Sequence, residues 1–166
     1  MNDFYIDDRY QREKRDAILI PYFYERWFGG HYQLCDGKPD LQSRAIDTII
    51  FRDKEQTTIE EKIVREKHDA ITLETKSCTV EGYEKTGWMF YGEADRLLWC
   101  FPLGIEGLDC WWIDFPALQK WFWPREKTFP PFKMKTKNQT EGRVVKLAAI
   151  KNAGLHILNF QVEKPQ

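Results

Sequence analysis

The sequence predicts a mixed α/β (α+β) fold in which a central mixed β-sheet is flanked by helices. Short apolar runs of strand length recur through the middle of the chain, amphipathic stretches of helical length lie near the start and after residue 115, and Gly, Pro and Asp separate them. Strands mixed with helices in this way are typical of a sheet covered by helices. Because 166 residues suit one hydrophobic core and the sequence has no internal repeat or linker, residues 1–166 are expected to form a single domain.

The first expected element is a surface helix over about residues 8–27, where charged and apolar positions mix as they do on a helix surface, with Gly29–Gly30 as its stop. Residues 31–43 are typical of a turn or loop because they contain Asp36-Gly37-Lys38-Pro39. Three strands are then expected, centred near residues 48, 62 and 73, where β-branched and other apolar side chains recur.

The second half of the chain is expected to add two strands joined by a turn, one helix and a final strand. These elements are predicted at about residues 96–101, 109–114, 116–123 and 155–162. Pro116 suits the first turn of the helix, and Pro124 is expected to end it. Residues 144–153 fit a short helix or a short strand equally well.

Composition excludes several classes of protein. Seven Trp, seven Tyr and eleven Phe within a 42% hydrophobic chain indicate a globular rather than a disordered protein. No apolar run approaches the roughly 18 residues that span a bilayer, and the first ten residues are too acidic for a secretory signal. We therefore expect a cytoplasmic protein with no membrane partner. The cysteines lack a C-x-x-C pair and are expected to be reduced and buried; they are Cys35, Cys78, Cys100 and Cys110.

Two features bear on nucleic-acid binding. The net charge of −1 argues against a generic nucleic-acid binder. Residues 125–146, however, include seven Lys and Arg side chains and only two acidic ones, so this segment is expected either to follow a phosphate backbone or to form a solvated loop. Aromatic rings either stack on unpaired bases or, as the sequence favours, are buried between sheet and helix. The rings in question are Trp99, Trp111, Trp112, Phe115, Trp121, Phe122 and Trp123. Trp111 and Trp112 must face opposite ways if they lie in one strand.

The most informative motif is Asp47 followed thirteen positions later by Glu60-Glu61-Lys62. Apolar residues flank both parts and the polar segment 52–56 connects them, so they are predicted to lie on neighbouring strands of a hairpin. Side chains alternate between the two faces of a strand, which places Glu60 and Lys62 on one face and Glu61 on the other. The neighbouring strand is expected to bring Asp47 beside Glu60 and Lys62.

Charged groups among Ile and Val need a physical reason. An isolated buried carboxylate is unfavourable by roughly several kcal/mol unless it is paired or holds a cation, and two adjacent carboxylates repel each other. A divalent cation resolves both problems, and Mg²⁺ usually takes one or two protein carboxylates and leaves its other positions to water and substrate phosphate. Lys62 would then polarise or orient an attacking water, while the cation neutralises charge that develops on the phosphoryl oxygens.

This constellation resembles the active site of the PD-(D/E)xK phosphodiesterase superfamily, which includes restriction endonucleases and Holliday-junction resolvases. The Asp of the pattern falls on Asp47 and its acid-x-Lys element on Glu60 and Lys62, although Ile46 stands where the fuller motif has Pro. The similarity covers about residues 40 to 101 and looks like a pattern in phage-borne and mobile-element members. Its parts are Asp40–Asp47, Ile71–Ser77, Lys85–Trp88 and Gly92–Phe101.

The resemblance implies a restriction endonuclease-like core and a Mg²⁺-dependent DNA endonuclease or resolvase that hydrolyses phosphodiester bonds, with Mn²⁺ as a substitute ion. It implies catalytic roles for Asp47, Glu60 and Lys62, and a metal held by Asp47, Glu60 and the main-chain carbonyl of Glu61. DNA is the implied partner, and by analogy a homodimer is expected.

Other interpretations stay open. Glu74-Thr75-Lys76 is a second acid-x-Lys element, but its separation from Asp47 is long for one hairpin. Glu74 is therefore either an auxiliary acid near the site or half of a structural ion pair with Lys76. The alternative function is a catalytically inactive nuclease-fold protein of a phage or mobile element that serves in binding or interaction, since fold alone does not fix function. In a third interpretation both acid-x-Lys elements are only structural ion pairs.

Overall fold

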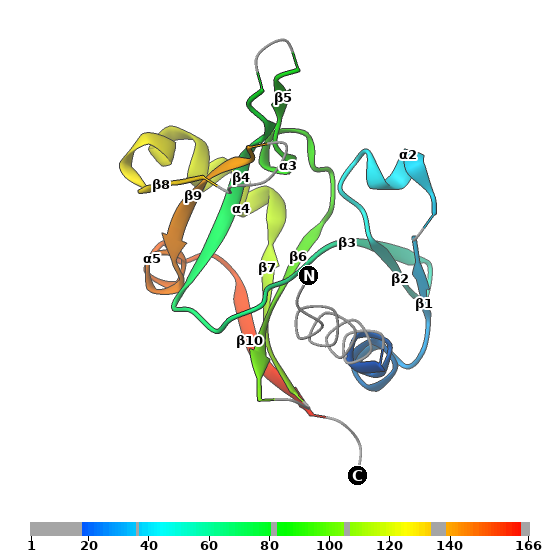
Figure 1. Ribbon diagram of the computed structural model, residues 1–166. Coiled ribbons are helices and arrows are strands. Elements are labelled where there is room, and N and C mark those ends of the chain that lie inside the picture. Colours follow the sequence, from blue (N-terminus) through cyan, green and yellow to red (C-terminus); the bar gives the residue numbers. More distant parts are fainter. Residues whose placement is uncertain (1–17, 36, 81–82, 105–106, 134–138, 164–166) are drawn as a thin grey trace, which may run out of the picture.

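The computed structural model describes residues 18–35, 37–80, 83–104, 107–133 and 139–163, and a six-stranded mixed sheet lies at its centre. The strands run in the order β1-β2-β3-β6-β7-β10 (Figure 1). Among them β3 and β6 pair in parallel, and the other neighbours are antiparallel. The bounds are β1 Tyr32–Leu34, β2 Thr48–Arg52, β3 Glu55–Ile63, β6 Arg96–Leu103, β7 Gly107–Asp114 and β10 Ile157–Glu163. The predicted central mixed sheet is confirmed.

A second sheet, of four antiparallel strands in the order β5-β4-β9-β8, does not follow from the sequence analysis. The strand expected near residue 73 is β4, and it pairs with the distant β9 instead of joining the central sheet. Residues 144–153 turn out to be both strand and helix, since they contain the end of β9 and all of α5 (Leu147–Asn152). The bounds are β4 Ala70–Cys78, β5 Lys85–Thr86, β8 Pro131–Lys133 and β9 Glu141–Lys146.

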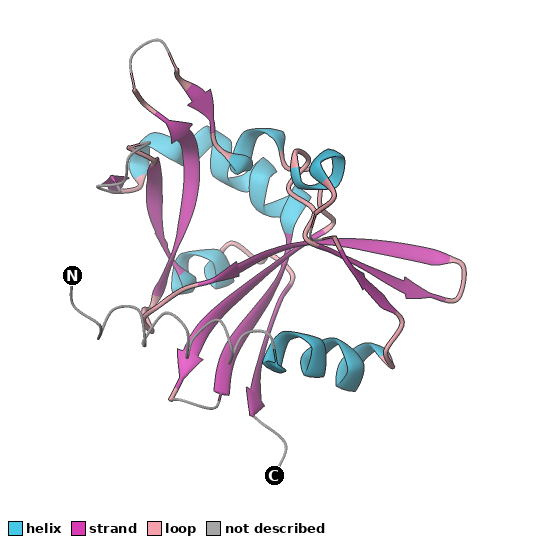
Figure 2. Ribbon diagram, turned by 45° about the vertical axis from the view of Figure 1, so that its right-hand side comes forward, coloured by secondary structure: helices cyan, strands magenta, loops and turns pink. Residues whose placement is uncertain are grey.

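The central sheet separates two apolar cores because successive side chains of its strands point to opposite faces. On β6, Leu97 and Trp99 belong to the core shared with the second sheet, whereas Leu98 belongs to the core under the N-terminal helix. Figure 2 shows that helix on one side of the central sheet and the second sheet with α3 (Trp88–Tyr91) and α4 (Phe115–Phe122) on the other. Helices therefore flank the sheet, as predicted.

The described part of the N-terminal helix covers residues 18–28 and ends at the predicted stop. Gly29 and Gly30 follow it with φ angles of 68° and 75°, a left-handed conformation that favours glycine. The earlier part of the predicted helix lies outside the described residues. Leu19, Phe23 and Tyr24 form the buried face of this helix against the sheet. Among the described residues, no helix has both the length and the apolar character needed to cross a bilayer.

One local expectation is wrong. Residues 31–43 are not only turn or loop, since they include β1 and the short helix α2 (Pro39–Gln42). Helix α4 begins as predicted: Pro116 lies in its first turn and Asp114 caps it by accepting the N–H of Ala117 at 2.9 Å. The α-helix ends at Phe122, before Pro124 as predicted, and the chain continues as the 3-10 helix η1 (Trp123–Thr128) with that proline in its first turn.

Burial of the aromatic cluster largely agrees with the expectation. Five of the seven rings are at most 8% exposed, and Trp121 and Trp123 are partly buried. Trp111 and Trp112 belong to opposite cores, as their neighbouring positions in β7 require. All four cysteines are buried, as expected.

Gly87→Ala tests how closely α3 packs on β4. A Cβ at position 87 would lie 2.4 Å from the carbonyl oxygen of Glu74, and the N–H of Gly87 donates to Thr75 at 2.8 Å. Because backbone meets backbone there, we expect the substitution to lower the free energy of unfolding by roughly 1 to 3 kcal/mol. Urea unfolding followed by circular dichroism measures this loss. The neighbouring exposed Thr86→Ala is the control, with an expected change within about 0.5 kcal/mol; equal effects of the two substitutions would contradict the close approach.

Candidate active site

Asp47 lies immediately before β2, at the open end of the predicted β2–β3 hairpin. Its N–H donates to the carbonyl of Ile59 at 2.8 Å, which places Asp47 next to Glu60 on the neighbouring strand. Its carbonyl accepts from the N–H of Cys35 at 2.7 Å, and its Oδ2 accepts from the N–H of Glu61 at 2.8 Å. Two backbone hydrogen bonds therefore hold Asp47 beside β3, and the Glu61 N–H orients its carboxylate.

Glu60 is the buried acid of the site, with 3% of the residue exposed. Its Oε1 forms an ion pair with Nζ of Lys62, and its side chain also hydrogen-bonds with Asp47. Burial raises the pKa of Glu60 from 4.5 to about 7, although the Lys62 ammonium opposes this rise and the Asp47 charge adds to it. The ion pair thus offsets only part of the pKa rise that burial causes, so Glu60 gains and loses its proton near neutral pH. The three predicted catalytic side chains are brought together.

Glu61 points to the other face of β3, as the alternation predicts. The Tyr24 phenol and the Thr48 hydroxyl both donate to its Oε1, at 2.5 and 2.6 Å. Burial raises the pKa of Tyr24 well above its ordinary value, and the Glu61 charge adds to the rise, so the phenol keeps its proton as a donor. Any part that Glu61 has in metal binding therefore belongs to its main chain, because its side chain is engaged on the opposite face of the sheet.

Glu74 approaches Lys62, whereas the described partner of Lys76 lies elsewhere. Burial raises the pKa of Glu74, while the Lys62 charge and a hydrogen bond from the Trp88 N–H lower it. Lys76 forms an ion pair with Glu141 of β9 at 3.8 Å. The pairing of β4 with β9 shifts register between Glu74 and Lys76, which interrupts the alternation expected for these two side chains. We call Asp47, Glu60, Lys62 and Glu74 the carboxylate–lysine cluster.

Helix α3 adds two aromatic side chains to the surroundings of this cluster. Nζ of Lys62 lies 5.3 Å from the centre of the Trp88 ring, close enough for the ring to attract the ammonium. Burial raises the pKa of Tyr91, and the cluster carboxylates add to the rise, Glu74 first and then Glu60, while Lys62 lowers it. The Gly-Trp pair marks Trp88 in the sequence. No local pattern marks Tyr91, whose approach depends on how α3 packs against β4.

Helix α4 holds α3 in this position. The side-chain amide of Gln119 donates to the carbonyls of Met89 and Gly92 at 3.1 and 3.0 Å, so both ends of the short helix are tied to α4. A Cβ at Gly92 would lie 2.7 Å from the Phe115 ring, which shows how closely the two helices approach. The aromatic side chains beside the cluster thus depend on tertiary packing.

The donors of the cluster fit a hydrated magnesium ion. In the part of the chain that the structure describes, no three or more His, Cys, Asp and Glu side chains form a group that could hold a metal. Mg²⁺ usually takes only one or two protein carboxylates, however, and Asp47 and Glu60 are adjacent. A cation there would displace the proton that Glu60 holds and would remove the repulsion between the two carboxylates. The chemistry of these two side chains therefore suits a magnesium site completed by water.

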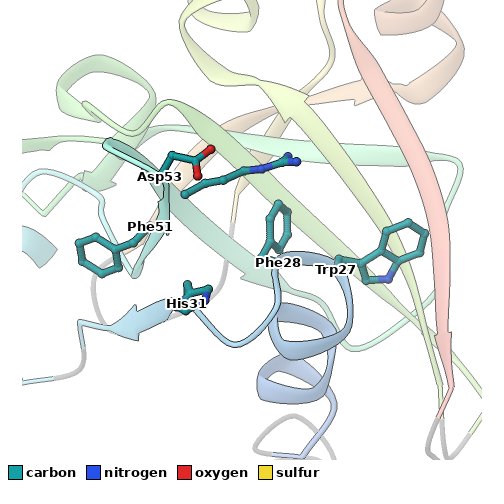
Figure 3. A pocket seen from close by; sticks show the side chains of 6 residues that line it. Trp27, Phe28, His31, Phe51 and Asp53 are labelled. Atoms are coloured by element: carbon teal, nitrogen blue, oxygen red, sulfur yellow. The ribbon is translucent and has the colours of Figure 1, made fainter.

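A cavity of about 330 Å³ lies at the other end of the β2–β3 hairpin, away from the cluster. Figure 3 shows the rings of Trp27 and Phe28, from the end of the N-terminal helix, and Phe51 of β2 around it, with His31 and Asp53. Arg52 completes its lining. The cavity is thus separate from the carboxylates, which lie where β2 begins.

The basic segment 125–146 is partly neutralised by its own acids. Arg143 pairs with Glu126 at 2.6 Å, and Lys133 pairs with Glu141 at 2.6 Å. Its residues 134–138 lie outside the described residues. Among the described residues of this segment, Arg125, Lys127 and Lys146 form no ion pair with a described acid, so the unbalanced charge lies on η1 and at the end of β9.

The raised pKa of Glu60 predicts a specific pH dependence of stability. In the unfolded chain this carboxyl titrates near 4.5, and in the folded chain near 7, so the folded state binds more protons between these values. Stability contributed by this group should therefore fall as pH rises through that window, by roughly 3 kcal/mol in all, because one pKa unit corresponds to about 1.36 kcal/mol. Urea unfolding from pH 5 to 8 in EDTA measures the slope.

Glu60→Gln is the matched variant, because the amide keeps the shape but does not titrate. Its unfolding free energy should fall less with pH than that of the wild type, and the difference isolates Glu60 from every other ionisable group. Parallel slopes for the two proteins would show that Glu60 titrates normally.

Comparison with known proteins gives no relative from which a role could be transferred. No protein-family model matches the chain, and neither the curated proteins nor the solved structures contain a significant match. The geometry of the carboxylate–lysine cluster therefore carries the functional argument.

Proposed function

We propose that the protein is a Mg²⁺-dependent deoxyribonuclease that hydrolyses phosphodiester bonds in DNA on a restriction endonuclease-like core. One observation carries the proposal: Glu60 is buried in an ion pair with Lys62 and lies beside Asp47. Two carboxylates and an ammonium, brought together where the start of β2 meets β3, are the groups that metal-assisted phosphodiester hydrolysis requires. The sequence resemblance to the PD-(D/E)xK superfamily supports the same assignment.

Asp47 and Glu60 are the residues that would hold the ion. Their roles differ, because the Asp47 carboxylate is fixed by the Glu61 N–H, whereas Glu60 must lose a proton before it can bind. When bound, Mg²⁺ supplies positive charge that stabilises the phosphoryl oxygens in the transition state. The site should therefore bind metal more strongly above pH 7 than below it.

Lys62 would position the attacking water. Its ammonium pairs with Glu60 and lies over the Trp88 ring, and its side chain is 32% exposed, so the group is oriented yet accessible. Hydrolysis adds one water: its oxygen bonds to phosphorus, the bond from phosphorus to the departing sugar oxygen breaks, and that oxygen receives a proton. Glu74 lies close enough to Lys62 for the ammonium to lower the pKa of that carboxyl against the rise that burial causes.

Lys62→Met and Lys76→Met form a matched test, since each removes the lysine of one acid-x-Lys element. Plasmid nicking with Mg²⁺ or Mn²⁺ should fall by about a hundredfold or more in Lys62→Met, because a positioned charged group is lost from the site. Lys76→Met should cut at nearly the wild-type rate, because Lys76 pairs with Glu141.

Asp47→Asn should abolish nicking too while leaving the fold intact, because the amide oxygen can still accept the Glu61 N–H. Circular dichroism checks the fold of each variant. Wild-type rates in both Lys62→Met and Asp47→Asn would refute the assignment.

Added Mg²⁺ should stabilise the wild type, and more so at pH 8 than at pH 6. Selective binding to the folded chain raises the free energy of unfolding by about 2.7 kcal/mol when free ligand is a hundred times its Kd. Calorimetric titration and thermal melting measure the two effects, and Glu60→Gln should weaken both. Metal binding without DNA cleavage would favour the catalytically inactive binding protein, and no binding at millimolar metal would favour a purely structural ion pair.

A further inference from the structure

Helix α3 presents two aromatic side chains to the outside beside the carboxylate–lysine cluster. Its first two residues, Trp88 and Met89, are buried, whereas Phe90 and Tyr91 are 53% and 41% exposed. Tyr91 is close enough to the cluster for its charges to shift the phenol pKa. Exposed rings at this place are therefore neighbours of the reacting groups.

Phe90 continues this surface away from the cluster. Its ring stacks on Trp123, the first residue of η1, with the ring centres 3.7 Å apart and the planes inclined by 23°. More than half of Phe90 remains exposed even though Trp123 covers one side of its ring. We call Phe90, Tyr91 and Trp123 the aromatic ledge.

Exposed cations lie on α4 and η1, the two elements that meet at Trp123 of the aromatic ledge. Lys120 of α4 and Arg125 and Lys127 of η1 are exposed, and none of them pairs with an acid among the described residues. The intervening acid, Glu126, is already paired with Arg143 at 2.6 Å. Helix α3 and the adjoining α4 and η1 therefore combine exposed rings with cations that have no described acid as partner, although the whole chain carries a net charge of −1.

We infer that the aromatic ledge binds unpaired nucleotides of single-stranded DNA, with a base against Phe90 and the backbone phosphates near Lys120, Arg125 and Lys127. Every base offers a ring face once it is unpaired, whereas bases within a duplex are already covered by their neighbours. Single-stranded DNA is bound by stacking of its bases on aromatic rings, and neutralisation of its phosphates by cationic side chains adds to the affinity. Single-strand binding by the aromatic ledge does not depend on the proposed function. Only the further statement that the bound strand is the one presented to the carboxylate–lysine cluster for hydrolysis rests on it.

Fluorescence anisotropy in EDTA tests the inference without any cleavage. The probes are a labelled oligonucleotide of about 12 nucleotides, within the length that single-strand sites cover, and the duplex of the same sequence. Wild-type protein should bind the single strand more tightly than the duplex. Phe90→Leu, which keeps an apolar side chain but removes the ring, should weaken single-strand binding by about tenfold with little effect on the duplex. Phe90→Trp, which keeps an aromatic ring, should retain single-strand binding.

Trp27→Leu is the matched control, because Trp27 is an equally exposed ring (54%) at the cavity of Figure 3, away from the cluster. It should bind both probes as the wild type does. Thermal melting confirms that each variant is folded. The inference is overturned if Phe90→Leu binds the single strand like the wild type or if Trp27→Leu has the larger effect. It is also overturned if the wild type binds the duplex at least as tightly as the single strand, or if it binds neither probe.

These outcomes are separate from those of the hydrolase proposal. Loss of cleavage in Asp47→Asn with normal single-strand binding concerns the carboxylates, whereas loss of binding in Phe90→Leu concerns the aromatic ledge. A protein that never cuts DNA but binds single strands through Phe90 would retain this inference and lose the nuclease.

Discussion

Burial of the Glu60 carboxylate between Lys62 and Asp47 is the interaction on which the rest of the site depends. A buried carboxylate is strongly unfavourable unless a charge or hydrogen bonds compensate it, and a single ion pair rarely does so completely. The raised pKa of Glu60 shows that compensation is incomplete here as well. Two neighbouring groups approach the same ammonium: the Trp88 ring lies beside it, and Glu74 brings a further carboxyl near it. A proton on Glu60 relieves this imbalance, and the proposed cation would relieve it in the same way.

The opposite face of β3 supports this arrangement. Glu61 holds the Tyr24 phenol and the Thr48 hydroxyl, which ties the strand to the N-terminal helix and to β2. The N–H of the same residue donates to Asp47. Glu61 therefore fixes the strand on one face with its side chain and orients the Asp47 carboxylate on the other face with its backbone N–H. Rigid support of this kind is what a reacting constellation requires, because small displacements of charged groups weaken their effect.

Local sequence pattern predicted the hairpin and the convergence of Asp47, Glu60 and Lys62, because alternation within a strand and pairing across a short turn are local properties. It could not predict the second sheet, since β4 pairs with β9 far along the chain. The same pairing explains the fate of the second acid-x-Lys element. A register shift lies between Glu74 and Lys76, so spacing alone could not show that one would approach Lys62 while the other pairs with Glu141. Trp88 had a weak signal in the Gly-Trp pair, and Tyr91 had none.

Helix α3 carries the part of the site that the sequence did not predict, and its position depends on tertiary structure. Four aromatic or apolar residues, Trp-Met-Phe-Tyr, make a helix too short to be stable alone, since nucleating a helix is unfavourable. It persists because Gln119 bonds to both of its ends and because two glycines allow close backbone approach at its borders. Once held there, its side chains divide by direction: Trp88 turns inward under Lys62, Tyr91 borders the cluster, and Phe90 faces outward onto Trp123. The packing that completes the electrostatic surroundings of the acids also sets the exposed rings beside them, so the chemistry of the site and the surface next to it have one structural cause.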